Sequence, residues 1–528
     1  MNGTLFTGAR PAVRGHYRGW LHTLFGFVTI FNLAIPTVRA GGERRAQYQI
    51  ITTASTYFVA PDGSDSDPGS AERPWATIIH AAETAVAGDT VLVRGGRYLL
   101  TSQVRPKNSG RPDAWITFVG HPGERPILDA QSIPQLPFAE RHLNNGAFQI
   151  EGVSYIRVAN LTIVNSHDAG ITIRDSSDIE LINNTTKGTY SSGIAVWDTN
   201  HDNKGTQRIR IIGNTISRAT TWDQASPDVP RGGQTPHEAL SIGGAIDFEV
   251  AYNHVYDSDK EGIDIKETSK RGKVHHNVVD TVDRQGIYVD AWFGQISDIE
   301  IFSNVVHDCR GAGVAISAEN GVAVEGLNLH DNLVFNNDGS GLYFSRWGAD
   351  NPRRTIRISS NVFYHNGYGP TKDGQAYHWQ TGGLYLYSAN LHDVLISKNI
   401  FSENRGFQIG YSELFLKDGL SWQKAAREHS IRIADNLIFG ANVMTSPIES
   451  GGAPIDRVKI YAIDGDRTIF GDPLFENPAK QNFALKNASP ATIAKLLTVA
   501  SPGNASSHGW WKTGFPPKLV RYAIRDVK

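Results

Sequence analysis

The sequence predicts an all-β fold, a right-handed parallel β-helix built as a single-stranded solenoid with an N-terminal capping helix. Three observations predict it: a recurring Gly-Ile-x-Ile pattern, an Asn that follows at regular distances, and a turn-rich composition. The 53 glycines against 2 methionines suit a β protein with many turns better than a helical bundle. Hydrophobic residues make up 40% and charged residues 20%, so we expect a folded chain and not a disordered one.

The repeat unit is recognisable from about residue 148 onward. A Gly opens a short strand with alternating apolar residues, a second strand follows, and an Asn closes it. The opening glycines are Gly170, Gly193, Gly262, Gly286, Gly313, Gly341 and Gly383. The matching asparagines are Asn183, Asn214, Asn253, Asn277, Asn304, Asn332, Asn361, Asn399 and Asn436. From Asn253 to Asn361 the spacings are 24, 27, 28 and 29 residues, which is typical of stacked supersecondary units.

Stacking explains the composition of the unit. Parallel strands of neighbouring coils lie about 4.8 Å apart, so equivalent positions form ladders along the axis. The alternating Ile and Val residues are expected to point into the core. A turn Asn can satisfy backbone groups and tolerate left-handed backbone conformations, and stacked Asn amides can bond one another. A structural role is therefore predicted for all these asparagines.

The N-terminal region differs from the repeats. Arg10, Arg14 and Arg18 precede an apolar run over 20–36, and small residues flank position 39, which is typical of a secretory signal peptide. A signal anchor is the alternative, but the run is shorter than the roughly 20 residues that span a membrane. Residues 77–85 are predicted to form a short amphipathic helix that covers the open end of the solenoid.

The predicted organisation has five parts. They are a signal peptide over 1–40, a linker over 41–56, an N-terminal cap with the first coils over 57–147, coils over 148–440, and C-terminal coils with a tail over 441–528. Loops that break the period are expected near 220–236, 367–382 and 410–429, the last with helical character. Loops on a rigid scaffold are where recognition usually occurs.

Composition also narrows the partners. The net charge of −2 and the lack of a basic block give no footprint for nucleic acid. The one cysteine, Cys309, cannot form an internal disulfide, and a buried coil position is expected for it. No later segment is apolar enough to span a membrane, so after signal cleavage we expect a secreted protein, extracellular or periplasmic.

The start of the mature chain resembles secreted bacterial β-helix proteins of the pectate-lyase-like superfamily, which act on carbohydrates. The matching segments are Asp62-Gly-Ser-Asp, Asp67-Pro-Gly-Ser, Pro74-Trp-Ala-Thr-Ile, Ala87-Gly-Asp-Thr-Val, Arg94-Gly-Gly-Arg-Tyr, Ile116-Thr-Phe, Pro122-Gly-Glu-Arg-Pro and Leu128-Asp. Together with the coils, the similarity covers most of the mature chain. It implies the fold and secretion, whereas hydrolases, lyases and epimerases all share this opening.

Within the superfamily, the layout is most similar to a family of calcium-dependent pectate lyases. That family holds its metal with a DG and a DDGxD on neighbouring coils. The corresponding segments here are Glu261-Gly and Arg284-Gln-Gly-Ile-Tyr, which lack most of the carboxylates. The family's calcium site is therefore not carried over, and no cofactor is assigned from the resemblance.

The coil register predicts which side chains face outward. If positions one and three after each coil Gly point inward, positions two and four point out. Three of these outward positions carry small, uncharged side chains, namely Thr172, Ala195 and Ala315. Over about four central coils, ionisable and aromatic residues gather at the outward positions instead. The predicted catalytic residues are His237, Glu238, Asp264, Lys266, Glu267, Tyr288 and Asp290. The predicted substrate-binding residues are Arg284, Trp292, Tyr343, Arg346 and Trp347, with Glu319 nearby.

Hydrolysis of a glycosidic bond is the first chemistry that these residues could perform. Asp264 and Asp290 differ by one coil and two residues, which separates their backbones by about 8 Å. Inverting glycosidases hold their two carboxyls about 6.5–9.5 Å apart. In this hypothesis Lys266 adjusts the ionisation of Asp290, and Asp264 or Glu238 donates the proton. A closer, retaining pair of Glu267 with Asp290 is an alternative.

Two other functional hypotheses remain. A polysaccharide lyase needs a base, for which Lys266, Tyr288 or His237 qualifies, and a cation such as Arg284 or Arg346. A metal held by Asp264, Glu267 and Asp290 would serve a lyase as well, and calcium suits such oxygen ligands. The third reading is a non-catalytic glycan-binding surface protein. All three predict a polysaccharide or oligosaccharide as the partner.

Overall fold

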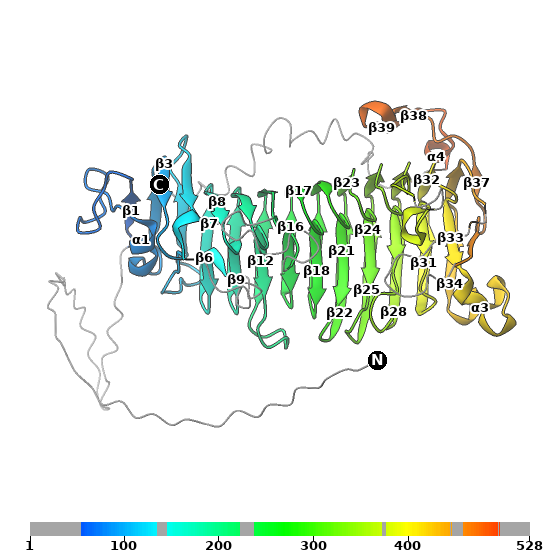
Figure 1. Cartoon of the computed structure of the whole chain (residues 1–528), viewed down its shortest axis with the longest axis horizontal. Coiled ribbons are helices and arrows are strands. Elements are labelled where there is room, and N and C mark those ends of the chain that lie inside the picture. Colours follow the sequence, from blue (N-terminus) through cyan, green and yellow to red (C-terminus); the bar gives the residue numbers. More distant parts are fainter. Residues whose placement is uncertain are drawn as a thin grey trace, which may run out of the picture. The chain divides into compact units, whose positions relative to one another are not determined.

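The computed structural model describes residues 54–134, 145–221, 237–371, 376–443, 445, 458–494 and 496. These residues form the predicted right-handed parallel β-helix, whose coils stack side by side along one axis (Figure 1). The expected signal peptide over 1–40 and most of the expected linker and of the loop over 220–236 lie outside the described residues. Among the described residues, no helix is long and apolar enough to cross a membrane.

Three long sheets make up the described part of the solenoid. Sheet A contains β1 (Thr56–Val59), β2 (Thr90–Val93), β4 (Ile116–Gly120), β7 (Ser154–Ala159), β10 (Ser177–Ile182), β13 (Gln207–Ile212), β16 (Ile246–Ala251), β19 (Lys270–His275), β22 (Gln295–Phe302), β25 (Ala323–His330), β28 (Arg353–Ser359), β31 (Leu391–Ser397) and β34 (Ile431–Ala434). Sheet B contains β3 (Gly96–Leu99), β5 (Pro126–Asp129), β8 (Thr162–Ser166), β11 (Thr185–Thr189), β14 (Thr215–Ser217), β17 (His254–Ser258), β20 (Val278–Val282), β23 (Val305–His307), β26 (Leu333–Phe335), β29 (Val362–Tyr364), β32 (Ile400–Ser402), β35 (Leu437–Phe439) and β37 (Ile469–Phe470). Sheet C contains β6 (Gly146–Glu151), β9 (Ala169–Arg174), β12 (Ile194–Trp197), β15 (Leu240–Gly243), β18 (Ile263–Glu267), β21 (Ile287–Ala291), β24 (Val314–Ser317), β27 (Leu342–Phe344), β30 (Leu384–Leu386), β33 (Ile409–Ser412) and β36 (Ile460–Ala462).

Each complete coil runs through one strand of sheet C, then A, then B. Neighbouring coils pair in parallel, as β18 does with β15 and β21. The last strand of sheet C, β36, pairs antiparallel with β33 and ends the described part of that sheet. Alternate residues of each strand point inward, so Ile263, Ile265 and Ile287 are fully buried in one continuous core. The inward half of the predicted register is thus confirmed.

The N-terminal end carries the expected helix. Helix α1 (Ile78–Thr84) begins after Thr77, whose side chain accepts a hydrogen bond from the backbone N–H of His80. A Thr in this position satisfies a backbone donor that the first helical turn leaves unpaired. The buried face of α1, with Ile78 and Ala81, packs into the same core and contacts β1.

A ladder of asparagines lines the turn between sheets A and B. Each Asn side chain except that of Asn436 donates to the Asn Oδ1 of the next coil, as Asn277 does to Asn304 at 2.9 Å, and all of them donate to a backbone carbonyl. The ladder residues are Asn184, Asn214, Asn253, Asn277, Asn304, Asn332, Asn361, Asn399 and Asn436.

One predicted ladder residue is wrong, because Asn184 and not Asn183 occupies the ladder. The left-handed conformation of this turn belongs to the residue before the ladder Asn, and Asn183 holds it with φ 54°. His276 does the same before Asn277, with φ 53°. The two asparagines at 183 and 184 therefore take different roles, which spacing alone could not separate.

The remaining elements decorate the solenoid. They are the 3₁₀ helices η1 (Ala130–Ser132), η3 (His378–Gln380), η4 (Glu413–Gly419) and η5 (Pro478–Lys480), the helices α3 (Trp422–Glu428) and α4 (Pro490–Ile493), and the hairpin of β38 (Phe475–Asn477) and β39 (Asn482–Leu485). The expected loop near 410–429 is thus strand up to Ser412 and largely helical after it. The C-terminal segment places Phe475, Phe483 and Leu496 on an outward apolar row of sheet B, formed by Val278, Val305, Leu333, Val362, Ile400 and Leu437.

Candidate active site on sheet C

The outward face of sheet C carries the ionisable residues that the register predicted. Asp264 pairs in register with Tyr288, and Lys266 pairs with Asp290 on the next strand. On the coil before, the same two positions are Ser241 and Gly243. These side chains face away from the core and are nevertheless buried, because Asp264 is fully buried and Asp290 is 3% exposed.

Four of them form a buried charge cluster: Glu238, Asp264, Lys266 and Asp290. Lys266 Nζ lies 3.0 Å from Glu238 Oε1 and 3.5 Å from Asp264 Oδ2. Ser241 Oγ donates to the other oxygen of Glu238 at 2.7 Å. Neither carboxyl oxygen of Asp264 has a hydrogen-bond partner among the described residues. Buried polar atoms of folded proteins nearly always have one, so this orphaned carboxyl requires an explanation.

Burial sets the protonation of the cluster. Burial, and then the carboxylate of Glu238, raises the pKa of Asp264 well above its usual range. Burial and Glu319 do the same to the pKa of Asp290. Burial also acts to raise the pKa of Glu238, but the ammonium groups of Lys266 and Lys260 outweigh it and lower that pKa.

Lys266 completes the cluster as its cation. Burial acts to lower its pKa, but the carboxylates of Glu238 and Asp264 hold that pKa well above its usual range. The shorter ion pair of the cluster joins Glu238 and Lys266, and the longer one joins Lys266 and Asp264. The carboxyls of Asp264 and Asp290 favour the protonated form.

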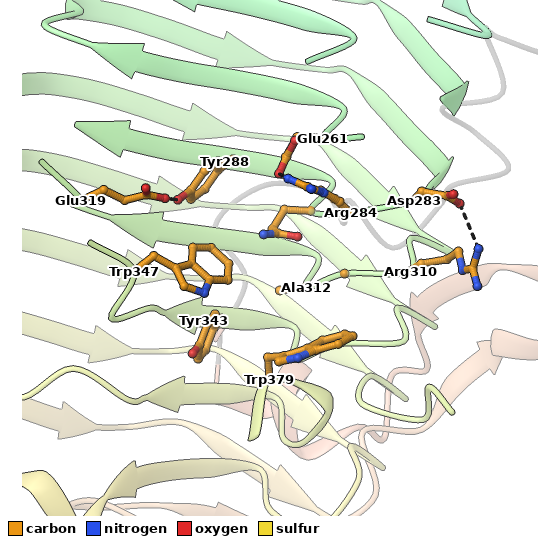
Figure 2. Close-up of a pocket in the computed structure, with 12 residues that line it drawn as sticks. Glu261, Asp283, Arg284, Tyr288, Arg310, Ala312, Glu319, Tyr343, Trp347 and Trp379 are labelled. Carbon is orange, nitrogen blue, oxygen red and sulfur yellow. Dashed lines mark hydrogen bonds and ion pairs between the residues drawn. The ribbon is translucent and has the colours of Figure 1, made fainter. Parts of the chain in front are cut away.

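A hollow of about 520 Å³ opens beside the cluster, toward the later coils. We call it the first hollow, and it is lined by Glu261, Asp283, Arg284, Gln285, Tyr288, Arg310, Gly311, Ala312, Glu319, Tyr343, Trp347 and Trp379. Figure 2 shows three polar pairs on its wall together with the rings of Tyr343, Trp347 and Trp379. Apolar walls with a few polar groups are typical of small-molecule sites.

The three polar pairs differ in character. The Tyr288 hydroxyl donates to Glu319 Oε1 at 2.5 Å. Arg284 lies 3.2 Å from Glu261, and Arg310 lies 3.3 Å from Asp283. Burial raises the pKa of Glu319, and it also raises the pKa of Tyr288 well above the usual value. Glu319 is therefore a carboxyl that holds its proton to higher pH than an exposed glutamate would.

A second hollow, of about 580 Å³, opens toward the earlier coils. It is lined by Glu151, Arg174, Asp175, Trp197, Thr199, His237, Lys266, Glu267, Trp292 and Phe293. Trp292 Nε1 donates to Asp290 Oδ2 at 2.5 Å, which ties the wall of this hollow to the charge cluster. Burial raises the pKa of Glu267 to about 7.

The structure thus divides the predicted patch into three places. Arg284, Tyr288, Tyr343 and Trp347 line the first hollow, and His237, Lys266, Glu267 and Trp292 line the second. Glu238, Asp264 and Asp290 lie between them and line neither hollow. Arg346 stands apart, with its Nε 3.1 Å from Asp350 and its guanidinium over the ring of Tyr387.

Several lining residues were not predicted. Trp379 lies in the expected loop near 367–382, and Trp197 occupies outward position four of its coil, so both carried a signal. Asp283 and Arg310 lie in turns before a coil Gly, where the outward rule gives no information. Within the described residues, no group of three or more His, Cys, Asp or Glu side chains is arranged to hold a metal ion.

Comparisons with known proteins agree with the fold. Residues 57–234 match the family model described as Pel9A-like, right handed beta helix region. The Bacillus subtilis (strain 168) protein YwoF, described as uncharacterized, is 28% identical over 479 residues, which are 82% of this chain and 91% of that protein.

Two pectate lyases are also similar. Pectate lyase PEL9 of Emericella nidulans is 30% identical over 154 residues, which are 28% of this chain and 37% of the lyase. The solved structure of pectate lyase Pel9A covers 61% of this chain and 80% of its own, with a TM-score of 0.42 and 15% identity. The resemblance to right-handed parallel β-helix proteins of the pectate-lyase-like kind is confirmed, and the family match ends before the first residue of the first hollow.

Proposed function

We propose that this protein is a secreted enzyme that cleaves a polysaccharide in the first hollow, by hydrolysis of a glycosidic bond. One observation carries the proposal: Glu319, a carboxyl whose pKa burial raises, lies in a hollow with Glu261 and aromatic walls. The β-helix fold and the carbohydrate-active proteins that share it support the coarser role. Secretion is proposed from the signal-like residues 1–40.

Glycosidases use two carboxyls, one that donates a proton and one that acts as base or nucleophile. A raised pKa suits Glu319 to the first task, because a general acid must still hold its proton near the working pH. Glu261 supplies the second carboxyl, with the positive charge of Arg284 3.2 Å away. The rings of Trp347 and Trp379 supply flat surfaces for a sugar ring.

The charges of the first hollow favour a neutral glycan over a uronate. Arg284 and Arg310 each already pair with a carboxylate, Glu261 and Asp283. A uronate carboxylate would therefore enter beside acidic groups whose cations are engaged, and juxtaposed like charges cost several kcal/mol. β-Elimination requires that carboxylate, so the charge balance supports hydrolysis.

The predicted pair of Asp264 and Asp290 stays a prediction with a changed role. Asp264 is fully buried and lines neither hollow, so it cannot contact a substrate in this conformation. We propose that the charge cluster influences the protonation of Glu319 without contacting the substrate. Two of its members act on the pKa of Glu319 in opposite directions, because Lys266 lowers that pKa and Glu238 raises it.

A polysaccharide lyase is the second candidate function, and the similarity to pectate lyase PEL9 favours it. Against it, the family match covers 57–234 and the first hollow begins at Glu261. A lyase would need a cation to neutralise the uronate, for which Arg284, Arg310 or added calcium would serve. Because a lyase leaves an unsaturated uronate that absorbs ultraviolet light, the products separate the two candidates.

The test is a screen of neutral and uronic-acid glycans, with reducing ends and ultraviolet absorbance read in parallel, with and without calcium. We expect reducing ends from a neutral glycan without new absorbance. Glu319→Gln should lower kcat by about 10²–10⁴-fold, the usual contribution of a general acid. Glu428→Gln, an exposed position on α3, is the matched control and should leave kcat unchanged.

Two results would overturn the proposal. Absorbance that rises with the reducing ends would establish a lyase. Absence of cleavage of every glycan tested, with binding retained, would leave the third reading, a glycan-binding protein without catalysis.

A further inference from the structure

Three aromatic side chains surround the second hollow, away from the residues proposed to cleave the substrate. Phe293 is 59% exposed although it is large and apolar. His201 stacks on its ring at a centroid distance of 3.8 Å, and Trp292 and Trp197 line the same hollow. A single exposed Phe is ordinary, but three rings around one concave surface indicate a binding site.

Gly243 makes room for this arrangement. It occupies the outward position that Lys266 takes on the next coil. A Cβ at Gly243 would lie 2.9 Å from the ring of Trp197 and 3.3 Å from Cγ of Glu267. The absence of a side chain therefore lets the Trp197 ring and the Glu267 side chain come together over β15.

Glu267 gives the hollow a carboxyl in its lining. It is 3% exposed and lines the hollow. Its Oε2 lies 2.6 Å from Nδ1 of His201 but outside hydrogen-bond geometry, and has no hydrogen-bond partner among the described residues. The Glu267 carboxyl lines the hollow and offers a polar partner to a ligand hydroxyl, and hydroxyls are what a sugar presents around its ring.

The charges of the hollow indicate which sugars would fit. Arg174 lies 3.5 Å from Glu151, and Lys266 lies 3.0 Å from Glu238, so both lining cations have carboxylate partners. Asp175 and Glu267 add further carboxyls to the lining. An anionic sugar would meet these acidic groups, whereas a neutral sugar needs only hydroxyl partners and a flat apolar surface.

We propose that the second hollow is a separate sugar-binding site that takes a neutral pyranose unit, with one face of the sugar against Phe293 and Trp292 and its hydroxyls bonded by Glu267. Its volume of about 580 Å³ is within the range of small-molecule sites, about 300–1,000 Å³. The site concerns binding alone and does not require that the first hollow cleave the glycan.

The experiment measures binding by calorimetry in the full-length Glu319→Gln variant, so that no probe is consumed. Cellohexaose, xylohexaose and laminarihexaose are the neutral probes, and hexagalacturonate is the acidic one. We expect one or more neutral probes to bind, and Phe293→Ala to weaken that binding about 10-fold or more, as truncation of an aromatic anchor does. Phe470→Ala is the matched control, because Phe470 is 64% exposed on sheet B and distant in sequence.

A second pair of variants separates the two hollows. Trp347→Ala alters the first hollow, and Glu267→Ala alters the second. Loss of binding on Glu267→Ala and Phe293→Ala supports the site. No binding of any neutral probe, a preference for hexagalacturonate, or sensitivity to Trp347→Ala alone would each overturn it. If no glycan is cleaved by the wild type but binding still depends on Phe293, the proposed hydrolysis fails and this site stands.

Discussion

The asparagine ladder and the outward face of sheet C are built on the same repeat, yet they use it in opposite ways. In the ladder the same residue returns on every coil from Asn184 to Asn436, and its amide is hydrogen-bonded each time. On sheet C, one outward position reads Thr172, Ala195, Ser241, Asp264, Tyr288, Ala315, Tyr343 and Tyr385. A residue that repeats on every coil makes contacts between coils. A position at which the residue changes from coil to coil carries side chains that are not needed for these contacts.

Hydrogen bonding shows the same difference. Nδ2 of Asn184 donates to the carbonyl of Val158 and to Asn214, and its Oδ1 accepts from the N–H of Leu161. Asp264 is as deeply buried and has no hydrogen bond at either oxygen within the described residues. The ladder therefore stabilises the fold, whereas the cluster keeps an unfavourable group that a purely structural protein would not need.

The largest expected effect comes from breaking the ladder with Asn184→Ala. The substitution removes three hydrogen bonds and leaves buried partners unsatisfied, so we expect a loss of about 4 kcal/mol. The measurement is urea unfolding followed by circular dichroism.

Asn183→Ala is the matched control, because this side chain is outside the ladder and its Oδ1 has no partner among the described residues. It should cost only about 1 kcal/mol, from the left-handed backbone at φ 54°. Equal losses in the two variants would contradict the assignment of Asn184 to the ladder.

The next effect concerns Glu267, because burial raises its pKa from the ordinary 4.5 to about 7 in the folded protein. Between these values the folded state keeps a proton that the unfolded state has released. The group therefore stabilises the fold below pH 4.5, and this contribution is lost as the pH rises through 7, by about 3 kcal/mol in total.

Glu267→Gln should remove this part of the pH dependence. Lys266 opposes the raised pKa, whereas Glu238 and Asp198 reinforce it, and His201 is in contact. The check is the difference in Tm between wild type and variant from pH 4.5 to pH 8, which should fall with pH. The same difference for Glu428→Gln on the exposed face of α3 should stay flat.

The smallest expected effect on stability is that of Asp264→Asn. The new amide is neutral and of the same shape, so it should match protonated Asp264 at pH 5. At pH 8 it should be more stable by about 1 kcal/mol, because a larger share of Asp264 then carries a buried charge that Lys266, 3.5 Å away, offsets only in part. A loss of several kcal/mol at both pH 5 and pH 8, as expected for a ladder residue, would show that Asp264 stabilises the fold as the ladder does.

The same substitution tests the predicted catalytic role of the aspartates. Asp264→Asn combined with Asp290→Asn should lower turnover if the charge cluster supports Glu319. Unchanged turnover of every cleaved glycan would remove both residues from catalysis.

The fold and the face that carries the site follow from local pattern. Alternation after each coil Gly predicted that Asp264 and Lys266 face away from the core, since period two leaves no other choice. The division into two hollows does not follow from periodicity. It depends on His201, in the turn after β12, meeting Phe293, and on Trp379 reaching the hollow that contains Tyr288. Contacts between residues that lie in different loops have no regular spacing in the sequence, so a search for periodicity does not find them.

The C-terminal segment has a consequence for how the molecule opens. In a solenoid each coil touches only its neighbours, so coils can unfold one at a time from an end. Phe483 contacts Phe335 and Tyr364 of sheet B, Phe475 contacts Tyr364, and Ser360 Oγ donates to the carbonyl of Leu496 at 3.0 Å. These contacts add to the pairing of the neighbouring coils that contain β26 and β29, so these two coils should exchange amide hydrogens more slowly than coils without such contacts. Glu319, Tyr343 and Trp347 lie on these two coils, so this part of the wall of the first hollow should persist until they open.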